Sequence, residues 1–246
     1  MNDQFYNSLS PFCDEMTNLE ERMTTEIDFF LSLKNKFSFN NALDIGCGTG
    51  IHSMILAKCG AEVVSIDPSE EMIKRAVTNF AESKNVRFIH ANLENYSENS
   101  KHSFESAFCI GNTFAHISVG LEKFVFALKE KLLKEAIFVL QILNYEKIVQ
   151  EKERIINIRE SDEKLFVRFY DFITDSELNF NVLMFDKKLK THNLDSTPIF
   201  AYKENFLKEI FISFGFELID TFGNMKFEKY NKCESQNLIL IFKNNK

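Results

Sequence analysis

Three glycines at alternate positions mark the part of the chain best suited to hold a ligand. The segment 43–50 reads Leu-Asp-Ile-Gly-Cys-Gly-Thr-Gly, with glycine at positions 46, 48 and 50. Glycine lets a backbone turn sharply, and it lets a ligand approach atoms that a Cβ would cover. Apolar residues at helical spacing follow from Ile51, so the loop leads into a helix N-terminus with free N–H groups and partial positive charge. The segment therefore predicts a cradle for a ligand.

Two aspartates near this loop narrow the choice of ligand. Asp44 lies two residues before the first glycine, where a carboxylate repels a pyrophosphate but attracts an ammonium group. The glycine spacing is G-x-G-x-G, whereas dinucleotide-binding loops have G-x-G-x-x-G. Both features favour S-adenosylmethionine (SAM), which has an amino group, a sulfonium and no phosphate, over a nicotinamide cofactor. Asp67 ends the next apolar run and suits ribose hydroxyls, which both cofactors contain, so it does not discriminate between them.

The elements that would position these residues alternate between strand and helix in the first half of the chain. Apolar runs predict strands at 42–45, 62–67, 86–90, 107–110 and 136–143. Helical spacing predicts helices at 51–59, 69–82 and 121–134, and Ser69 is the expected N-cap of the second. Such alternation implies parallel strands joined by right-handed crossovers, with helices on both faces of one sheet.

The pattern changes after Tyr145. Alternating runs at 165–172 and 178–185 predict an antiparallel insertion over about 150–200, with a short helical link at its start. A helix at 203–214 should end at Gly215, and strands at 217–222 and 237–242 close the chain. We expect one domain over 1–246 of the α/β class. Its core is a Rossmann-like, seven-stranded, mostly parallel sheet with an antiparallel last strand, and the small β insertion forms a substrate lid.

Charge and composition exclude several kinds of partner. The chain has 29 Lys and Arg against 36 Asp and Glu, a net charge of −7, so it lacks the clustered cations that grip nucleic acid. No apolar stretch approaches the roughly 20 residues that cross a bilayer, and no signal sequence is visible. The five cysteines are widely spaced and form no CxxC pair, so we expect no metal site and a reducing, cytoplasmic location.

The glycine loop resembles motif I of the class I SAM-dependent methyltransferases. Segments 22–31, 50–56 with 64–67, and 110–116 resemble the glycine N-methyltransferases and their small-molecule relatives more narrowly. The broad resemblance covers about 1–145 and resumes near 203–242.

The resemblance assigns roles to individual residues. It implies that Asp67 binds both ribose hydroxyls, that Asn92 contacts the adenine amino group, and that Arg22 pairs with the carboxylate of SAM. The cofactor-binding residues expected in all are Tyr6, Arg22, Asp44, Gly46, Cys47, Gly48, Gly50, Asp67, Pro68, Met72, Asn92, Leu93, Ile110, Gly111 and Asn112.

One departure from the family bears on the acceptor. In glycine N-methyltransferases the fifth strand ends in an Arg, two residues before a Tyr, and that Arg binds the substrate carboxylate. This chain has Leu143 there, two residues before Tyr145. Because burying an unpaired carboxylate is costly, glycine is a doubtful acceptor unless Arg168 or Arg159 reaches in from the insertion.

The acceptor should bind at the carboxyl ends of the central strands, where open α/β sheets hold their ligands. His116 and Tyr145 lie at such ends and are the predicted catalytic residues, with His116 orienting or deprotonating the acceptor. The expected substrate-binding residues are Asn112, His116, Tyr145, Arg168 and Tyr170.

The sequence thus predicts a SAM-dependent methyltransferase of a small molecule, with an amine nitrogen as the favoured acceptor atom. O- or C-methylation and SAM binding without catalysis stay open, as do a monomer and a homodimer. Nucleic-acid substrates are disfavoured further, because the chain has neither an Asn/Asp-Pro-Pro-Tyr motif nor a Pro-Cys pair.

Overall fold

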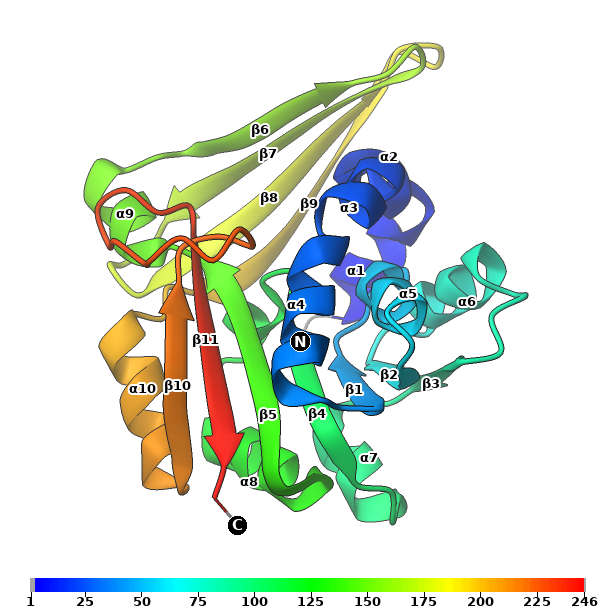
Figure 1. Cartoon of the computed structure of the whole chain (residues 1–246). Helices are drawn as coiled ribbons and strands as arrows, with labels where there is room; N and C mark the ends of the chain where they lie inside the picture. The colour runs from blue at the N-terminus through cyan, green and yellow to red at the C-terminus, as the bar shows by residue number, and fades with distance from the viewer. Residues whose placement is uncertain (1–2, 246) are drawn as a thin grey trace.

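A seven-stranded sheet forms the centre of the structure, a computed structural model that describes residues 3–245 (Figure 1). Its strands are β1 (Asn41–Ile45), β2 (Glu62–Asp67), β3 (Val86–His90), β4 (Phe104–Cys109), β5 (Leu132–Leu143), β10 (Phe216–Phe222) and β11 (Asn237–Asn244). They lie in the order β10-β11-β5-β4-β1-β2-β3. β11 is antiparallel to both of its neighbours, and the remaining neighbours pair in parallel. The predicted Rossmann-like sheet with an antiparallel last strand is confirmed.

Helices cover both faces of this sheet (Figure 1). On one face, α4 (Ile27–Phe37) and α5 (Ile51–Lys58) bury their apolar side chains against the strands. On the other face, α7 (Leu93–Asn99), α8 (Leu121–Lys131) and α10 (Glu204–Ser213) do the same. β5 contributes side chains to both faces of the sheet, because successive side chains of a strand point to opposite faces. Phe138 packs on the face covered by α7, α8 and α10, and Val139 packs on the face covered by α4 and α5.

The helix α6 (Glu70–Asn79) follows β2 and begins as the sequence predicts. The Ser69 hydroxyl accepts a hydrogen bond from the Met72 N–H at 3.2 Å, which confirms Ser69 as the N-cap. None of the helices described between residues 3 and 245 is long and apolar enough to cross a membrane.

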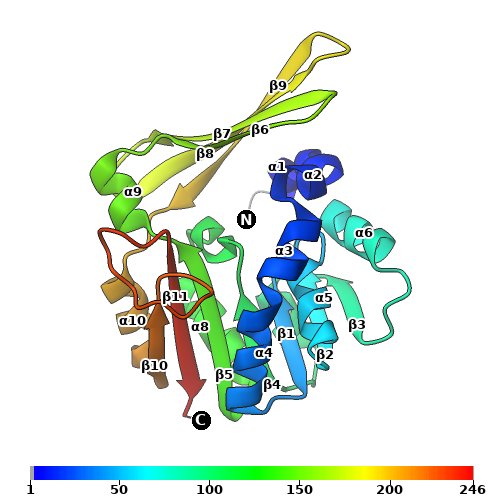
Figure 2. The same ribbon diagram turned by 45° about the horizontal axis from the view of Figure 1, so that its top comes forward.

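A second, fully antiparallel sheet interrupts the chain after β5, and we call it the insertion sheet. It consists of β6 (Ile155–Glu160), β7 (Lys164–Phe172), β8 (Glu177–Asp186) and β9 (Thr191–Phe200), and the short helix α9 (Tyr145–Glu151) leads into it. The insertion sheet extends over the carboxyl ends of the central strands and above the N-terminal helices (Figures 1 and 2). These helices are α1 (Asp3–Leu9), η1 (Ser10–Phe12), α2 (Cys13–Thr17) and α3 (Leu19–Thr25).

An apolar cluster joins the N-terminal helices to the insertion sheet. Phe5, Leu9 and Met16 from the helices are buried with Phe166 of β7 and Val182 of β8. The N-terminal segment and the insertion therefore support each other, although they lie more than a hundred residues apart in the sequence.

The sequence predicts two strands in the insertion, and the structure has four. The missed strands, β6 and β9, are the two edges of the insertion sheet. β9 contains Pro198, which has no N–H to donate, and an edge strand tolerates this because one of its sides forms no ladder. Most of β9 is exposed and its residues are largely polar, so its sequence lacks the alternating apolar pattern that predicts a strand.

The predicted helix over 121–134 is too long by one turn. α8 ends at Lys131, and Leu132 already belongs to β5, where it is buried and pairs with Phe104 of β4. The strand is irregular near this point, since Glu135 has a φ of 63°. Pairing with β4 overrides the local helical pattern.

Phe242 of β11 offers a test of the core. Its ring lies 4.8 Å from that of Phe211 and 6.4 Å from those of Phe138 and Phe216, centroid to centroid. We expect Phe242→Ala to lower the free energy of unfolding by about 3–5 kcal/mol, measured by urea denaturation. Phe126→Ala, at a ring that is 59% exposed, is the control and should cost about 0.5 kcal/mol or less. Equal losses in the two variants would contradict this packing.

Candidate active site

The glycine loop joins β1 to α5 and is fixed against the end of β2. The N–H groups of Gly46 and Cys47 both donate to the Ile66 carbonyl, at 2.8 and 3.1 Å. Gly48 donates its N–H to Asp67 Oδ2 at 2.9 Å. These hydrogen bonds fix the position of the loop beside the carboxyl end of β2.

The glycines of the loop have different reasons to lack a side chain. All three have positive φ, 70° at Gly46, 55° at Gly48 and 90° at Gly50, a region that disfavours other residues. A Cβ on Gly46 would lie 2.2 Å from Thr113 Cγ2, and one on Gly50 would lie 2.9 Å from the Phe88 ring. A Cβ on Gly48 would meet no atom within 4 Å. Gly46 and Gly50 thus allow close packing, whereas Gly48 leaves open space beside the loop.

That space is a cavity of about 150 Å³, which we call the glycine-loop cavity. Of the predicted cofactor-binding residues, it is lined by Tyr6, Arg22, Gly46, Cys47, Gly48, Asp67, Met72, Ile110 and Gly111. Sequence reasoning did not include Cys13, Thr17, Thr49, Ile51, His52 and Thr113, which also line it. Thr113 has a clear role, because its hydroxyl lies 3.0 Å from the Ile110 carbonyl and 3.3 Å from the Gly46 carbonyl.

Asp67 presents a held carboxylate in this cavity. Oδ2 accepts from the Gly48 N–H, and Oδ1 accepts from the Ser69 N–H at 2.8 Å. These contacts fix the orientation of the carboxylate.

A second cavity, of about 390 Å³, adjoins the other side of the loop. Pro68, Asn92 and Leu93 line it, and Gly46 and Thr113 line both cavities. Asn92 caps α7 here, since its Oδ1 accepts from the Asn95 N–H at 2.8 Å. We call this the Asn92 cavity.

Three of the predicted cofactor-binding residues, Asp44, Gly50 and Asn112, line neither cavity, and Asn112 lines a third cavity instead. Asp44 is buried beneath the loop, where its Oδ2 accepts from the Ser53 hydroxyl at 2.6 Å and burial raises the pKa of the carboxyl. Gly50 packs against Phe88, as described above. A contact of Asp44 with the cofactor's ammonium group stays a prediction, and the structure shows a carboxylate that holds the first turn of α5.

Arg22, at the end of α3, is held in a buried cluster with Glu26 and His52. Its Nε lies 2.7 Å from Glu26 Oε1, and one Nη lies 2.8 Å from His52 Nε2. His52 Nε2 is also 3.1 Å from Glu26 Oε2. Burial raises the pKa of Glu26, but the hydrogen bond and charge of His52 and the charge of Arg22 outweigh it and lower the pKa to about 2. Glu26 is therefore a carboxylate at neutral pH and orients the guanidinium.

A third cavity, of about 640 Å³, lies between the central sheet, the N-terminal helices and the insertion sheet. We call it the central cavity. The predicted acceptor residues Asn112, His116, Arg168 and Tyr170 line it, and so does Leu143. Tyr6, Arg22 and Gly111 line both this cavity and the glycine-loop cavity, so the two spaces share a wall.

Tyr6 and His116 meet at that shared wall. The Tyr6 hydroxyl lies 2.7 Å from His116 Nε2, where His116 ends the short helix η2 (Thr113–His116). Nδ1 of this imidazole is buried and has no hydrogen-bond partner within the part of the chain that the structure describes. Burial lowers the pKa of His116 to about 3, so the imidazole is neutral at physiological pH.

Tyr145 lies behind the cavity wall rather than on it. It is 1% exposed and does not line the central cavity. Its hydroxyl accepts from Asn112 Nδ2 at 2.6 Å, while Asn112 Oδ1 accepts from the Leu143 N–H at 3.1 Å. Burial raises the pKa of the Tyr145 phenol, so the hydroxyl stays protonated at neutral pH and cannot act as a base. The predicted catalytic role of Tyr145 has no contact with the cavity to support it, and the structure shows a residue that holds Asn112 at a φ of 69°.

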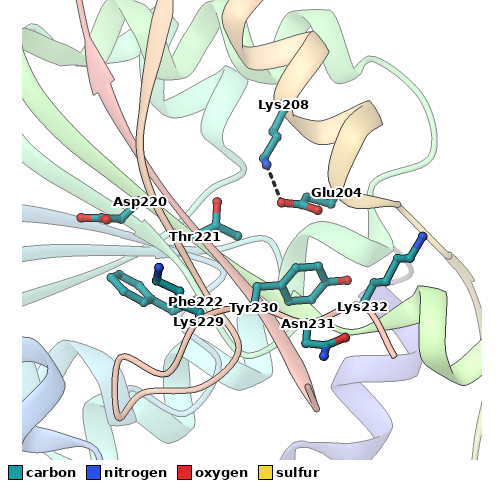
Figure 3. Close-up of a pocket in the computed structure, with 9 residues that line it drawn as sticks. All are labelled: Glu204, Lys208, Asp220, Thr221, Phe222, Lys229, Tyr230, Asn231 and Lys232. Carbon is teal, nitrogen blue, oxygen red and sulfur yellow. Dashed lines mark ion pairs between the residues drawn. The ribbon is translucent and has the colours of Figure 1, made fainter. Parts of the chain in front are cut away.

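A separate pocket of about 540 Å³ lies at the β10 edge of the central sheet (Figure 3). It is formed by α10, β10 and the segment 229–232, and an ion pair between Lys208 and Glu204 borders it (Figure 3). No predicted site residue lines it. No group of His, Cys, Asp and Glu side chains within residues 3–245 is placed to hold a metal ion.

Comparison with known proteins identifies the class. Residues 42–135 match the family described as "Methyltransferase domain". The chain is 23% identical over 233 residues to the glycine/sarcosine N-methyltransferase of Aphanothece halophytica, a match that covers 94% of this chain and 86% of that protein. A SAM-dependent methyltransferase from Clostridium acetobutylicum has the same fold, with a TM-score of 0.81, 19% identity and coverage of 97% and 98% of the two chains. The sugar N-methyltransferase KedS8 from Streptoalloteichus is similar with a TM-score of 0.66, 13% identity and coverage of 93% and 91%.

The chain is a class I SAM-dependent methyltransferase. It is an enzyme, and SAM is its cofactor. Among the relatives it resembles, N-methyltransferases of small molecules recur.

The most informative residues that sequence reasoning missed are Glu26 and His52. Glu26 lies four residues after Arg22, a helical ion-pair spacing that the sequence does offer. The contact of His52 with Arg22 carries no such signal, because it joins α3 to α5 across 30 residues.

The Arg22–Glu26–His52 cluster predicts a pH-dependent contribution to stability. The pKa of Glu26 is lowered from 4.5 to about 2 on folding, so the contribution is present above pH 4.5 and is lost as the pH falls towards 2. We expect Glu26→Gln to reduce the free energy of unfolding at pH 7 by about 1.5–3 kcal/mol, and the difference from wild type to shrink at pH 3.

Urea denaturation at the two pH values measures this difference. Glu71→Gln is the matched control, since Glu71 pairs with Lys74 on the exposed face of α6 and should contribute about 0.5 kcal/mol or less. A loss in Glu26→Gln that stayed the same at pH 3 would show that the charge of Glu26 is not what stabilises the cluster.

Proposed function

We propose that this enzyme transfers the methyl group of SAM to the nitrogen of a small-molecule amine held in the central cavity. The observation that carries the proposal is the wall shared by the glycine-loop cavity and the central cavity, which brings a cofactor and an acceptor to either side of Tyr6 and Gly111. The names of similar proteins support nitrogen as the acceptor atom, since they include glycine/sarcosine and sugar N-methyltransferases.

In this proposal the cofactor extends across the glycine loop. The open space at Gly48 leaves room for the cofactor to pass close to the loop. The Asp67 carboxylate suits the ribose hydroxyls of SAM, and Arg22 suits the carboxylate of its methionine part. Asn92 and Leu93 would receive the adenine in the Asn92 cavity. SAM supplies a methyl group that its sulfonium already activates, so the protein has mainly to align the acceptor and exclude water.

The residues near the shared wall suit an amine acceptor. An amine attacks only as the free base, and a site with little charge favours that form over the ammonium ion. The neutral imidazole of His116 provides such a surrounding, and its Nε2 lies 2.7 Å from the Tyr6 hydroxyl at the shared wall. Because its pKa is lowered to about 3, the imidazole is a weak base that does not take a proton from an ammonium ion. We propose that His116 orients the amine, which reacts as its free base.

The insertion sheet acts as a substrate lid in this proposal. Ile156, Arg168, Tyr170, Phe180 and Val182 line the central cavity, and all of them belong to its strands. Tyr145 and Asn112 act as positioning residues, since they brace the wall at the carboxyl ends of β4 and β5.

Two alternatives make different demands on the cavity. O-methylation of an alcohol, or C-methylation, would need a base that removes a more weakly acidic proton. The phenols of Tyr6 and Tyr145 cannot do so, because burial raises the pKa of both and keeps them protonated. SAM binding without catalysis would leave the central cavity without a role. Turnover of any small amine separates the second alternative from the proposal.

The cofactor assignment of Asp67 is tested by calorimetric titration with S-adenosylhomocysteine (SAH) beside NADH. We expect SAH alone to bind, and Asp67→Ala to weaken its binding about 10- to 100-fold, because hydrogen bonds to a charged group contribute roughly 1.5–3 kcal/mol. Asp162→Ala, at an exposed position of the insertion, serves as the control and should bind SAH like wild type. Unchanged binding in Asp67→Ala would remove Asp67 from the site.

The role of His116 is tested by the pH dependence of methyl transfer. Because the pKa of His116 is about 3, kcat/KM should follow the ionisation of the acceptor amine and show no inflection near pH 6.5. We expect His116→Ala to lower kcat about 10²-fold, and Tyr6→Phe to lower it less because the imidazole stays in place. Full turnover of His116→Ala across the pH range would rule out any part for His116 in orienting the amine.

A further inference from the structure

Arg168 is the cation that the insertion sheet presents to the central cavity. It lies on β7, paired in register with Asn157 of β6 and Val182 of β8. Its side chain lines the cavity on the same strand face as Phe166 and Tyr170, both of which are buried. Its position on a paired central strand fixes where the guanidinium can reach.

No carboxylate of the described residues 3–245 forms an ion pair with Arg168. Within the described part of the chain its one hydrogen-bond partner is Asn157, whose Oδ1 accepts from Nε at 2.7 Å. Two other half-buried arginines differ, since Arg22 pairs with Glu26 and Arg75 pairs with Asp14. Burial lowers the pKa of the Arg168 guanidinium, and the positive charges of Arg22 and Arg159 act in the same direction.

This environment favours binding of an anion. A partly buried cation without a counter-ion is costly, and an entering carboxylate would offset that cost. Since Nε is bonded to Asn157, the two Nη groups remain for a ligand, and their parallel N–H bonds match the planar carboxylate.

The rest of the cavity wall indicates what kind of molecule carries the anion. Leu143, Ile156, Phe180 and Val182 form apolar parts of the wall. The volume of about 640 Å³ falls within the range of sites that hold drug-sized ligands, which is far more than glycine fills. Leu143 also occupies the place where glycine N-methyltransferases have their carboxylate-binding Arg, so the end of β5 cannot bind an anion here.

We propose that the acceptor is an amine with an apolar body and a carboxylate, and that Arg168 binds this carboxylate from the insertion sheet. The inference rests on the proposed function, because it names the class of acceptor for the same cavity. Arg168 is in this view a specificity-determining residue, and glycine is too small to reach it and fill the apolar wall together.

The test is calorimetric titration of the SAH-saturated enzyme with matched pairs of amines that differ in carboxylate against carboxamide. The pairs are glycine and glycinamide, leucine and leucinamide, and 6-aminohexanoate and 6-aminohexanamide. We expect leucine or 6-aminohexanoate to bind more tightly than glycine, and at least tenfold more tightly than its own carboxamide.

Variants at Arg168 assign this preference to the residue. Arg168→Gln should weaken binding of the acid at least tenfold and leave the carboxamide and SAH unaffected, whereas Arg168→Lys should lie between because it keeps the charge but not the fork. Unchanged SAH affinity shows that both variants are folded. Arg154→Gln is the control, since Arg154 pairs with Asp171 on the exposed side of the same sheet.

Several results would overturn the inference. These are a carboxamide that binds as well as its acid, acid binding that survives Arg168→Gln, glycine binding as tightly as the larger acids, or no acid binding at all.

Assays with labelled SAM separate this inference from the proposed function. If acids bind through Arg168 but yield no methylated product, the proposed amine methylation is wrong and the carboxylate site is supported. Methylation of neutral amines in preference to acids would do the reverse.

Discussion

The hydrogen bond from the Gly48 N–H to the Asp67 carboxylate fixes the geometry on which the site depends. It joins the loop after β1 to the end of β2, beside the two N–H groups that donate to the Ile66 carbonyl. Since the carboxyl ends of parallel strands lie at one edge of a sheet, the loop after β4 reaches the same place, and Thr113 contacts the Gly46 carbonyl from there. These hydrogen bonds hold the carboxyl ends of β1, β2 and β4 together, and this arrangement determines where the cavities lie on either side of the loop.

The central sheet was predictable because its signals are local. The strands β1, β2 and β4 are largely buried on both faces and therefore read as continuous apolar runs. The glycine loop is visible in its own residue types. The edges of the insertion sheet are not predictable in this way, since β9 is mostly exposed and polar and contains Pro198. Its pairing with β8 forms it, and a single strand's sequence does not show the partner.

The residues of the candidate site likewise divide into those with a local sequence signal and those brought together only by the fold. Gly48 and Asp67 could be read from spacing, whereas the contact between Tyr6 and His116 joins residues 110 positions apart. The burial that makes His116 neutral is likewise a property of the assembled cavity. The position of Tyr145 behind the wall was not predictable either, because the resemblance gives its place in the chain and not the direction of its side chain.

The N-terminal helices connect the glycine-loop cavity to the central cavity. Tyr6, Cys13, Thr17 and Arg22 each line both the glycine-loop cavity and the central cavity. The helices are tied to α6 by polar contacts, from the Ser69 hydroxyl to Asn7 at 2.7 Å and from Arg75 to Asp14 at 2.8 Å. On their other side they pack against the insertion sheet. An acceptor site at this place therefore requires both the N-terminal helices and the insertion sheet, and the central sheet alone would leave it open to water.

The distribution of charge in the cavity separates binding from chemistry. Arg22 is neutralised by Glu26, and His116 is neutral, so the wall next to the glycine-loop cavity bears no net charge from these groups. Arg168, on the insertion sheet, has no such partner. A zwitterionic acceptor needs an attraction strong enough to leave water, yet its amine must lose a proton before it reacts. In the proposed function, an unpaired cation on the insertion sheet and groups without net charge beside the glycine-loop cavity meet both needs. The carboxylate of the acceptor supplies the attraction, and the surroundings of the amine favour its free base.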